Sequence, residues 1–357
     1  MPNIPTFSTV KLNENIIVCL WMIFCFVALT YKLGEVPPYH ADENFYVESA
    51  LRMVESGDYV TPVYHEKNRF AKPILYYWMV VSSFKVFDVS LFSARFPSVI
   101  FGTLSIGLIF LLGKILFNRR VGLFSAFILP STYLHFQISR WSTTDMALNF
   151  FILFSTYIFV LMCDTKFEKK YFSYLFYLSL GLGFMIKGPP AILIPGLTIL
   201  GFLIFTKRKN WFNNLCIFEG LIILSIIILP WFITMYWMHG EEFKNHILGN
   251  EIKNRLVHDT PFSFYYVGVL IRYQLPWSLL LIFSALKQCA NFEFVNHKGV
   301  SFNHSIKALN KNIREYFQLF LKDKNEPVIF CCIWILVCLV LFTLLRVEHS
   351  RYMLPSC

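Results

Sequence analysis

The sequence predicts an all-α protein with several helices that cross a membrane. Of its 357 residues, 56% are hydrophobic and only 15% are charged, whereas charged residues make up about 25% of a typical soluble domain. The apolar residues gather in uncharged stretches of 16–19 residues, close to the roughly 20 residues that a helix needs to cross the bilayer. This pattern excludes a soluble enzyme, a disordered protein and an ordinary nucleic-acid-binding protein.

Nine apolar segments are predicted to span the membrane. Eight contain no charged residue, and the ninth, residues 264–286, contains Arg272 alone. In chain order, the segments are residues 16–31, 96–113, 121–139, 146–163, 171–186, 188–206, 220–238, 264–286 and 327–345. No small-x-small cleavage site follows the first, so we expect an uncleaved span and not a signal peptide. A tenth stretch, residues 73–84, is short for a span and predicts an interfacial or re-entrant helix.

Basic residues predict how these spans are oriented. The chain carries a net charge of +10, and basic residues cluster at positions 114–120, 166–170, 207–209 and 287–324. All four clusters face the cytoplasm if the N-terminus is cytoplasmic and residues 73–84 do not cross, as the positive-inside rule requires. We therefore expect a cytoplasmic N-terminus, with the C-terminus on the outer side.

This topology divides the chain into one transmembrane domain and two larger loops. The domain covers residues 1–357. The first outer loop, with interfacial helices, covers residues 34–95, and a cytoplasmic loop covers residues 287–326, with a short helix expected around residues 306–321. Many of the remaining charged residues fall at outer ends of spans or in outer loops. Because charges near a bilayer are costly unless they face water or a cavity, this distribution predicts a site on the outer side.

Acidic residues at that side are the first candidates for chemistry. Asp42 and Glu43 begin an amphipathic segment, where they could cap a helix and complement its dipole. Alternatively, a carboxylate there could act as a general base near Lys72, a cation able to hold a phosphate. Asp145 is a second acid at the outer mouth of a span, and an ion pair with Arg140 is the structural alternative for it.

Arg272 is a further candidate because of its depth. It lies about eight residues into its predicted span, on the order of 12 Å from the end. An arginine at that depth is a functional candidate, with a lipid phosphate or Asp145 as the candidate partner. The alternative is that its side chain extends back to the interface. The nine cysteines show no metal-ligand spacing.

An ordered set of motifs carries a family resemblance. From about Leu33 to Pro355 the chain reads DEN, ESGDYVTP, RFAKPILYYW, SARFPS, SRWSTTDM, GLGFMIKGPPAILIPG, PWF, LPWSLLL and RYMLP. In this order the motifs resemble the bacterial lipid-linked-sugar glycosyltransferases of the dolichyl-phosphate-mannose protein mannosyltransferase superfamily, and most of all the aminoarabinose transferases of lipid A. The resemblance implies a GT-C type membrane fold. It also implies a bacterial inner-membrane location and sugar transfer from a polyprenyl-phosphate carrier on the periplasmic side.

The resemblance implies roles for individual residues. Asp42 matches the catalytic or acceptor-orienting carboxylate, with Glu43 beside it, and Asp145 matches the second acid of the site. The residues expected to bind the donor phosphate are Lys72 in the KP element, Lys187 in the KGP turn, Arg255 in the GNEIKNRL stretch, and Arg351 and Tyr352 before the LP element, with Arg272 added from its depth.

Cofactor and metal requirements follow from the same comparison. Many relatives carry Glu where this chain has Ala71, and some carry His where it has Ile252. We therefore expect no cofactor and no bound metal, although the resemblance leaves a divalent metal open. Relatives continue beyond the RY-x-LP element, whereas this sequence ends at Cys357, so we expect a C-terminally truncated relative.

These observations favour a membrane glycosyltransferase that moves a sugar from a polyprenyl-phosphate donor to lipid A or another envelope acceptor. A protein O-mannosyltransferase is an alternative within the same class. A transporter or flippase for lipid-linked sugars is the alternative from another class, and an inactive truncated relative is the third.

Overall fold

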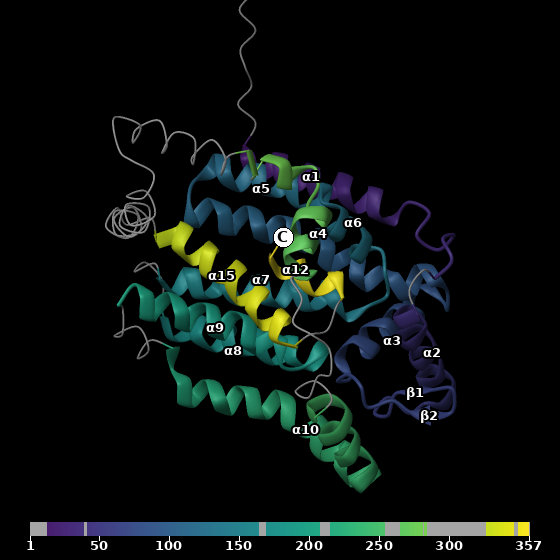
Figure 1. The fold of residues 1–357 in the computed structure, drawn as a ribbon. Coiled ribbons are helices and arrows are strands. Elements are labelled where there is room, and N and C mark those ends of the chain that lie inside the picture. Colours follow the sequence, from purple (N-terminus) through teal and green to yellow (C-terminus); the bar gives the residue numbers. More distant parts are fainter. Residues whose placement is uncertain are drawn as a thin grey trace, which may run out of the picture.

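The computed structural model describes residues 13–38, 41–163, 169–207, 215–253, 265–280, 282–283, 326–345 and 349–356. They form a bundle of helices with one small hairpin at its end (Figure 1). The elements are α1 (Glu14–Thr30), α2 (Ala41–Ser56), β1 (Val63–Tyr64), β2 (Lys67–Asn68), α3 (Leu75–Phe87), α4 (Leu91–Leu116), α5 (Arg119–Ser131), α6 (Tyr133–Ser139), α7 (Thr144–Cys163), α8 (Lys169–Lys187), α9 (Pro190–Phe205), α10 (Ile217–Asn245), η2 (His246–Lys253), α12 (Tyr265–Tyr273), α15 (Glu326–Leu345) and η3 (Ser350–Ser356).

The predicted all-α membrane fold is confirmed. Within the described residues, α4, α7, α10 with η2, and α15 are each long and apolar enough to cross a membrane. The pair α5 and α6, bent by 64°, makes a fifth span if it counts as one. Helices also occupy the other predicted segments in whole or in part, so the count of nine spans stays a prediction. The expected helix at residues 306–321 and most of the loop 287–326 lie outside the described residues.

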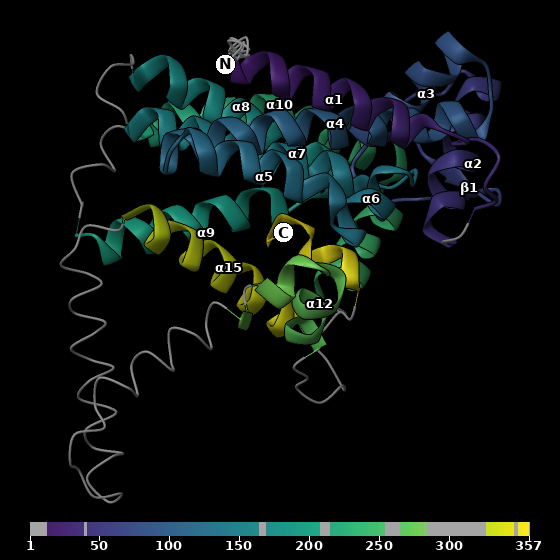
Figure 2. The same cartoon turned by 90° about the horizontal axis from the view of Figure 1, so that it is seen from above.

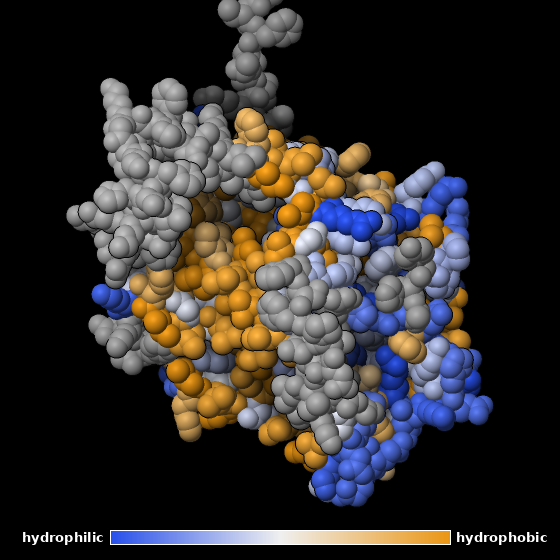
Figure 3. All heavy atoms as spheres, in the orientation of Figure 1, coloured by the Kyte–Doolittle hydropathy of each residue, from blue (hydrophilic) through white to orange (hydrophobic). Residues whose placement is uncertain are grey.

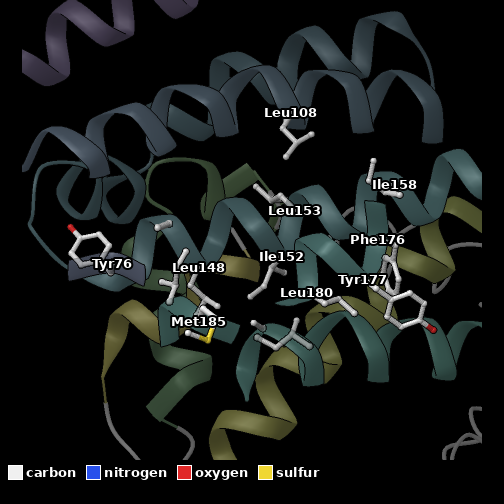
Figure 4. Packing of buried hydrophobic residues seen from close by; sticks show 14 of the residues in the cluster. Tyr76, Leu108, Leu148, Ile152, Leu153, Ile158, Phe176, Tyr177, Leu180 and Met185 are labelled. Carbon is white, nitrogen blue, oxygen red and sulfur yellow. The ribbon is translucent and has the colours of Figure 1, made fainter. Parts of the chain in front are cut away.

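Helix α7 forms the centre of the bundle. In its apolar stretch 72% of the residues are buried, against 11% in α10. Its residues Leu148, Ile152 and Leu153 lie in the same buried cluster as Leu180 and Met185 of α8 (Figure 4). This packing fixes the end of α7 relative to the end of α8, where two site residues lie.

Helix α10 is peripheral and exposes apolar side chains to the surroundings. Phe218 is 75% and Ile226 67% exposed. Such exposure suits contact with lipid tails, which solvate apolar side chains. In the space-filling view hydrophobic residues cover much of the face with α9 and α15, while hydrophilic residues gather at the end with α2 and the hairpin (Figure 3).

The first predicted outer loop folds into α2, the hairpin and α3, which lie together at one end of the bundle (Figure 2). Strand β1 pairs antiparallel with β2, with Val63 opposite Asn68. The two turn residues, His65 and Glu66, both have positive φ (46° and 63°), as a tight two-residue hairpin turn requires. The amphipathic helix predicted from Asp42 is confirmed as α2, and α3 covers most of the short stretch 73–84.

Helix α3 is too short to cross the bilayer and instead packs inward. It has 13 residues, and its side chains Tyr76, Tyr77 and Val80 are fully buried against neighbouring helices. The hydroxyl of Tyr76 lies 2.9 Å from that of Ser98 on α4. Helix α3 thereby helps to hold α2, and with it Asp42, against the core of the bundle.

Candidate active site

Four charged side chains from four separate elements meet at one end of the bundle. Asp42 lies in the first turn of α2, Asp145 in the first turn of α7, Lys187 is the last residue of α8, and Arg351 lies in η3. Arg351 forms ion pairs with both carboxylates: its Nη2 with Asp42 Oδ2, and its Nε with Asp145 Oδ2 at 3.6 Å. Lys187 Nζ forms an ion pair with Asp145 Oδ1. We call these four residues the charge cluster.

The helix ends favour this arrangement of charges. Asp145 lies in the first turn of α7 and Lys187 in the last turn of α8, where the partial charges at the helix ends stabilise an acid and a base respectively. Gly188, with φ of 86°, ends α8 in the left-handed region that glycine adopts without strain. Pro190 then begins α9. The KGPP sequence is therefore a turn that presents Lys187.

Burial differs between the two acids. Side chains of Asp145, Lys187 and Arg351 are 5%, 7% and 8% exposed, whereas that of Asp42 is 33% exposed. Burial disfavours the charged form of Arg351, but the carboxylates of Asp145 and Asp42 outweigh it and raise the pKa of Arg351 above its ordinary value. Arg351 therefore keeps its charge, and Asp42 is the more accessible of the two carboxylates.

Aromatic rings border the cluster. The Nζ atom of Lys187 lies 4.5 Å from the ring centroid of Tyr352, a distance typical of a cation–π contact. The Tyr352 ring stacks on Phe342 of α15 at 5.2 Å between centroids, and His349 meets it edge-on at 5.4 Å. These contacts fix Tyr352, so that Lys187 is held from two sides, by a carboxylate and by a ring.

A mostly apolar cavity opens beside the cluster. It has a volume of about 340 Å³ and includes Lys187 in its lining. Its other walls are mainly apolar, among them Phe70, Ala71, Trp231 and Leu341. A narrower space, lined by Asp145, Lys187, Arg351 and Tyr352 among others, adjoins it through Lys187. Charged groups thus meet an apolar cavity, an arrangement that suits a ligand with a charged head and a hydrocarbon tail.

Glu43 lies away from this cluster. Its side chain is fully buried, and its two carboxylate oxygens accept hydrogen bonds from Arg95 Nε and Nη2 at 2.6 and 2.9 Å. The Oε1 atom also accepts from the backbone N–H of Ser142 at 2.9 Å. Consecutive residues of a helix point about 100° apart, which separates Glu43 from Asp42. Glu43 therefore ties α2 to α4 and to the turn before Asp145.

Other predicted residues lie elsewhere or remain undescribed. Lys72 is half-buried and its Nζ donates to the carbonyl oxygen of Ala71 at 2.8 Å. Arg272 is exposed on α12, with its guanidinium 5.8 Å from the Tyr273 ring, and among the described residues Asp145 pairs with Lys187 and Arg351 instead. Arg255 lies outside the described residues, and its role in binding the donor phosphate stays a prediction.

The alternative pairing of Asp145 with Arg140 is wrong for this structure. Arg140 Nη1 instead donates to the carbonyl oxygens of Leu29 and Tyr31, both at 2.9 Å. Arg95 was not identified from the sequence. It immediately precedes the apolar segment 96–113, and the depth that singled out Arg272 gives no signal for a residue at that position. Within the described part of the chain, no group of three His, Cys, Asp or Glu side chains is placed to hold a metal ion.

Comparison with known proteins supports the same reading of the fold. Residues 71–236 match the family model described as dolichyl-phosphate-mannose-protein mannosyltransferase. The predicted family resemblance is confirmed. The chain is 26% identical over 322 residues to the undecaprenyl phosphate-alpha-4-amino-4-deoxy-L-arabinose arabinosyl transferase of Pseudomonas aeruginosa, covering 88% of this chain and 52% of the relative. It is 29% identical over 276 residues to the arabinosyl transferase 2 of Proteus mirabilis, whose name is otherwise the same, covering 73% of this chain and 48% of the relative.

Solved structures show the same architecture. The crystal structure of ArnT from Cupriavidus metallidurans bound to undecaprenyl phosphate superposes with a TM-score of 0.78 at 21% identity, covering 96% of this chain and 58% of that one. The archaeal oligosaccharyltransferase AglB from Archaeoglobus fulgidus gives 0.54 at 12% identity, covering 97% and 50%. The GT-C type membrane fold is thereby confirmed. The chain spans about half of the length of the curated relatives that it matches.

Proposed function

We propose that this chain forms the membrane part of a glycosyltransferase that moves a sugar from a polyprenyl-phosphate donor to lipid A or another envelope acceptor. The observation that carries the proposal is the charge cluster of Asp42, Asp145, Lys187 and Arg351 at the mouth of an apolar cavity. The relatives, whose names state transfer of an aminoarabinose from undecaprenyl phosphate, support this class of donor.

Arg351 and Lys187 are suited to stabilise the leaving group. When the bond between the sugar carbon and the donor oxygen breaks, negative charge grows on the departing polyprenyl phosphate. Cations fixed in a largely water-excluded site stabilise such charge in the transition state. Both cations are nearly buried and are held by Asp145, so they need little reorganisation when the donor arrives. The apolar cavity beside Lys187 would receive the first part of the prenyl tail.

Asp42 is suited to act as the general base. It is the more exposed carboxylate of the cluster, and a base must lie within hydrogen-bond reach of the hydroxyl it deprotonates. In the step we propose, the acceptor oxygen forms a bond to the sugar carbon, the carbon–phosphate oxygen bond breaks, and Asp42 takes the acceptor proton. The donor phosphate competes with Asp42 for Arg351, so donor binding would release the base from its ion pair.

We also propose that this site faces the periplasm across a bacterial inner membrane, with the N-terminus in the cytoplasm. Two groups of charges at opposite ends of the bundle support this orientation. Lys114 and Arg119 both pair with Glu14 at the start of α1, and α1 runs from that end toward the end with α2 and β1 (Figure 2). Lys114 and Arg119 thus lie at the end opposite the charge cluster, as the positive-inside rule expects for basic residues.

Expression in a bacterial host without its own lipid A aminoarabinose transferase tests the proposal. The extracted envelope glycolipids are weighed by mass spectrometry, with Asp42→Asn as the matched inactive variant and Asp58→Asn, in the loop after α2, as the control. A sugar-sized mass gain that persists in Asp58→Asn and disappears in Asp42→Asn is the expected result. A gain that survives in Asp42→Asn would remove the assigned base. No gain in any sample, with the protein folded in the membrane and acceptor present, would overturn the activity for this chain.

A further inference from the structure

A second cavity lies at the same end of the bundle as the charge cluster, but beside α4, α6 and the segment that follows α1. It has a volume of about 320 Å³ and includes Arg95, Arg140, Gln137 and Trp141 in its lining. It shares no lining residue with the cavities beside Lys187. The proposed sugar-transfer reaction makes no use of this cavity, which leaves its polar lining to be explained.

Arg140 is held at this cavity by part of its guanidinium only. Its Nη1 donates to the carbonyl oxygens of Leu29 and Tyr31, at the end of α1, where helix carbonyls lack partners within the helix. Among the described residues, neither Nε nor Nη2 of Arg140 has a hydrogen-bond acceptor. Capping α1 therefore fixes the guanidinium in place and leaves donors of a planar fork for a further acceptor, a geometry that matches phosphate.

The cavity carries an uncompensated positive charge. Arg95 is neutralised by Glu43, which accepts from both its Nε and Nη2. Arg140, by contrast, forms no ion pair with a carboxylate in the part of the chain that the structure describes. Partial burial lowers the pKa of Arg140, and the neighbouring charge of Arg95 lowers it further. The negative charge of an anion bound in the cavity would offset both effects.

The surroundings of the cavity suit a lipid. Tyr133 and Phe136, two of its lining residues, are 52% and 42% exposed, and Tyr31 and Val27 on the adjacent end of α1 are 68% and 60% exposed. Tyrosine at the end of a span is typical of the membrane interface, which is the depth of lipid headgroups. Apolar exposed side chains beside it offer contact for acyl chains.

We propose that this cavity binds the phosphate of an anionic phospholipid, with Arg140 and Gln137 as the donors. Gln137 donates one amide hydrogen to the hydroxyl of Tyr133 at 2.9 Å, and a primary amide has a second hydrogen to give. Arg140 supplies the charge. Bound lipid would also strengthen the contact between α6 and α1, because the same guanidinium holds the last carbonyls of α1.

Thermal unfolding of the purified full chain in a zwitterionic detergent tests this site. The probes are short-chain phosphatidylglycerol, short-chain phosphatidylcholine and inorganic phosphate at equal concentration. Phosphatidylglycerol is expected to raise the Tm by about 2–4 °C, because a ligand that binds the folded state stabilises it. Phosphatidylcholine is expected to leave the Tm unchanged. An equal shift with phosphatidylcholine would overturn the requirement for an anion. An equal shift with inorganic phosphate would show a free-anion site and overturn the lipid.

Substitutions of Gln137 locate the effect. Gln137→Glu places a carboxylate beside Arg140 without touching the bonds to α1 and should abolish the shift. Gln137→Lys should enlarge it, so the two variants give opposite predictions even if one of them folds poorly. Arg52→Gln, an exposed site on α2, should leave the shift unchanged. Because these variants leave Arg351 and Lys187 intact, a full shift in Gln137→Glu, or an unchanged one in Gln137→Lys, would assign the lipid to another site and overturn the proposal.

Discussion

Arg351 and Asp42 stand 309 positions apart in the chain and form an ion pair at the end of the bundle. Arg351 also contacts Asp145 with Nε at 3.6 Å from Oδ2. The same guanidinium therefore connects the proposed base with the buried acid that orients the proposed phosphate-binding cations. The charges of two carboxylates and two cations balance in the cluster. An arriving phosphate must therefore compete for a cation that already pairs with a carboxylate.

Removing the charge of Arg351 should slow sugar transfer strongly. We expect Arg351→Gln to lower the rate by about 10²–10³, the range observed when one fixed donor to a developing negative charge is lost. Arg351→Lys keeps the charge but loses the fork that reaches both carboxylates, and should be intermediate. The measurement is the transfer rate per amount of folded protein in membranes. Arg52→Gln serves as the surface control, and a rate for Arg351→Gln close to that of the parent would exclude Arg351 from the reaction.

Glu43 should matter for stability and not for the chemistry of transfer. Glu43→Gln leaves Arg95 buried without a counter-charge, and breaking one partner of a buried ion pair costs about 3–5 kcal/mol. We expect a clear fall in the Tm in detergent. Glu55→Gln, on the exposed side of the same helix, should change stability by less than about 0.5 kcal/mol.

A double variant tests whether the loss of stability comes from the buried charge of Arg95 that Glu43→Gln leaves without a counter-charge. Glu43→Leu with Arg95→Met removes both charges, and replacing a buried pair by apolar residues is often nearly neutral. Its Tm should recover most of the loss seen in Glu43→Gln. If Glu43→Gln unfolds at the parent temperature yet abolishes transfer, Glu43 belongs to the chemistry and the structural assignment fails.

The sequence predicted the fold class and all four residues of the charge cluster, but not how these residues pair. Apolar stretches of span length predict helices because every buried backbone group needs a partner inside the bilayer, and helices occur at the predicted positions. Motif resemblance singled out Asp42, Asp145, Lys187, Arg351 and Tyr352, which the structure brings together.

The contacts of Glu43 and Arg140 differ from those that the sequence predicted, because they depend on helix packing that sequence periodicity cannot show. Glu43 looks like Asp42 in the sequence, yet one step along a helix turns its side chain toward Arg95. Arg140 is five residues from Asp145 and is a reasonable partner by spacing alone, but its guanidinium instead reaches the carbonyls of α1. Such pairings are set by the packing of helices distant in sequence, which one sequence alone does not fix.

The stability of the folded chain should depend on the protonation of His349. Partial burial lowers the pKa of His349 below its ordinary value of about 6.5, and the charge of Arg351 lowers it further, against the opposing effect of Asp42. Between the lowered folded value and about 6.5 the unfolded chain holds a proton that the folded chain does not. Stability therefore rises with pH across this window and is lost as the pH falls through it.

Replacing His349 isolates that contribution. We expect His349→Gln to flatten the dependence of the Tm on pH in the acidic range below about 6.5. At a pH of about 8 the imidazole is neutral in both states, so the difference between parent and variant there gives the baseline unrelated to protonation. Equal slopes of Tm against pH for both proteins in the acidic range would show that His349 does not couple to folding.

Close packing of α8 against α10 should make Gly220 intolerant of a larger side chain. A Cβ atom at Gly220 would lie 2.1 Å from Cε2 of the Tyr177 ring, well inside the contact distance of two carbon atoms. Tyr177 is largely buried and packs against Phe176 at 5.3 Å between centroids, so its ring has little room to move. Overpacking of this kind typically costs about 1–3 kcal/mol, and we expect Gly220→Ala to lower the Tm accordingly.

A compensating substitution tests whether the ring causes the loss. Tyr177→Leu removes the atoms nearest the added methyl group, so Gly220→Ala should cost less in that background than in the parent, which a double-mutant cycle of Tm values measures. Gly249→Ala, where no described residue lies within 4 Å of the added Cβ, is the matched control and should change the Tm little. If Gly220→Ala costs the same with Leu at position 177, the contact with the ring is not the cause, and helices α8 and α10 pack less tightly than their contact implies.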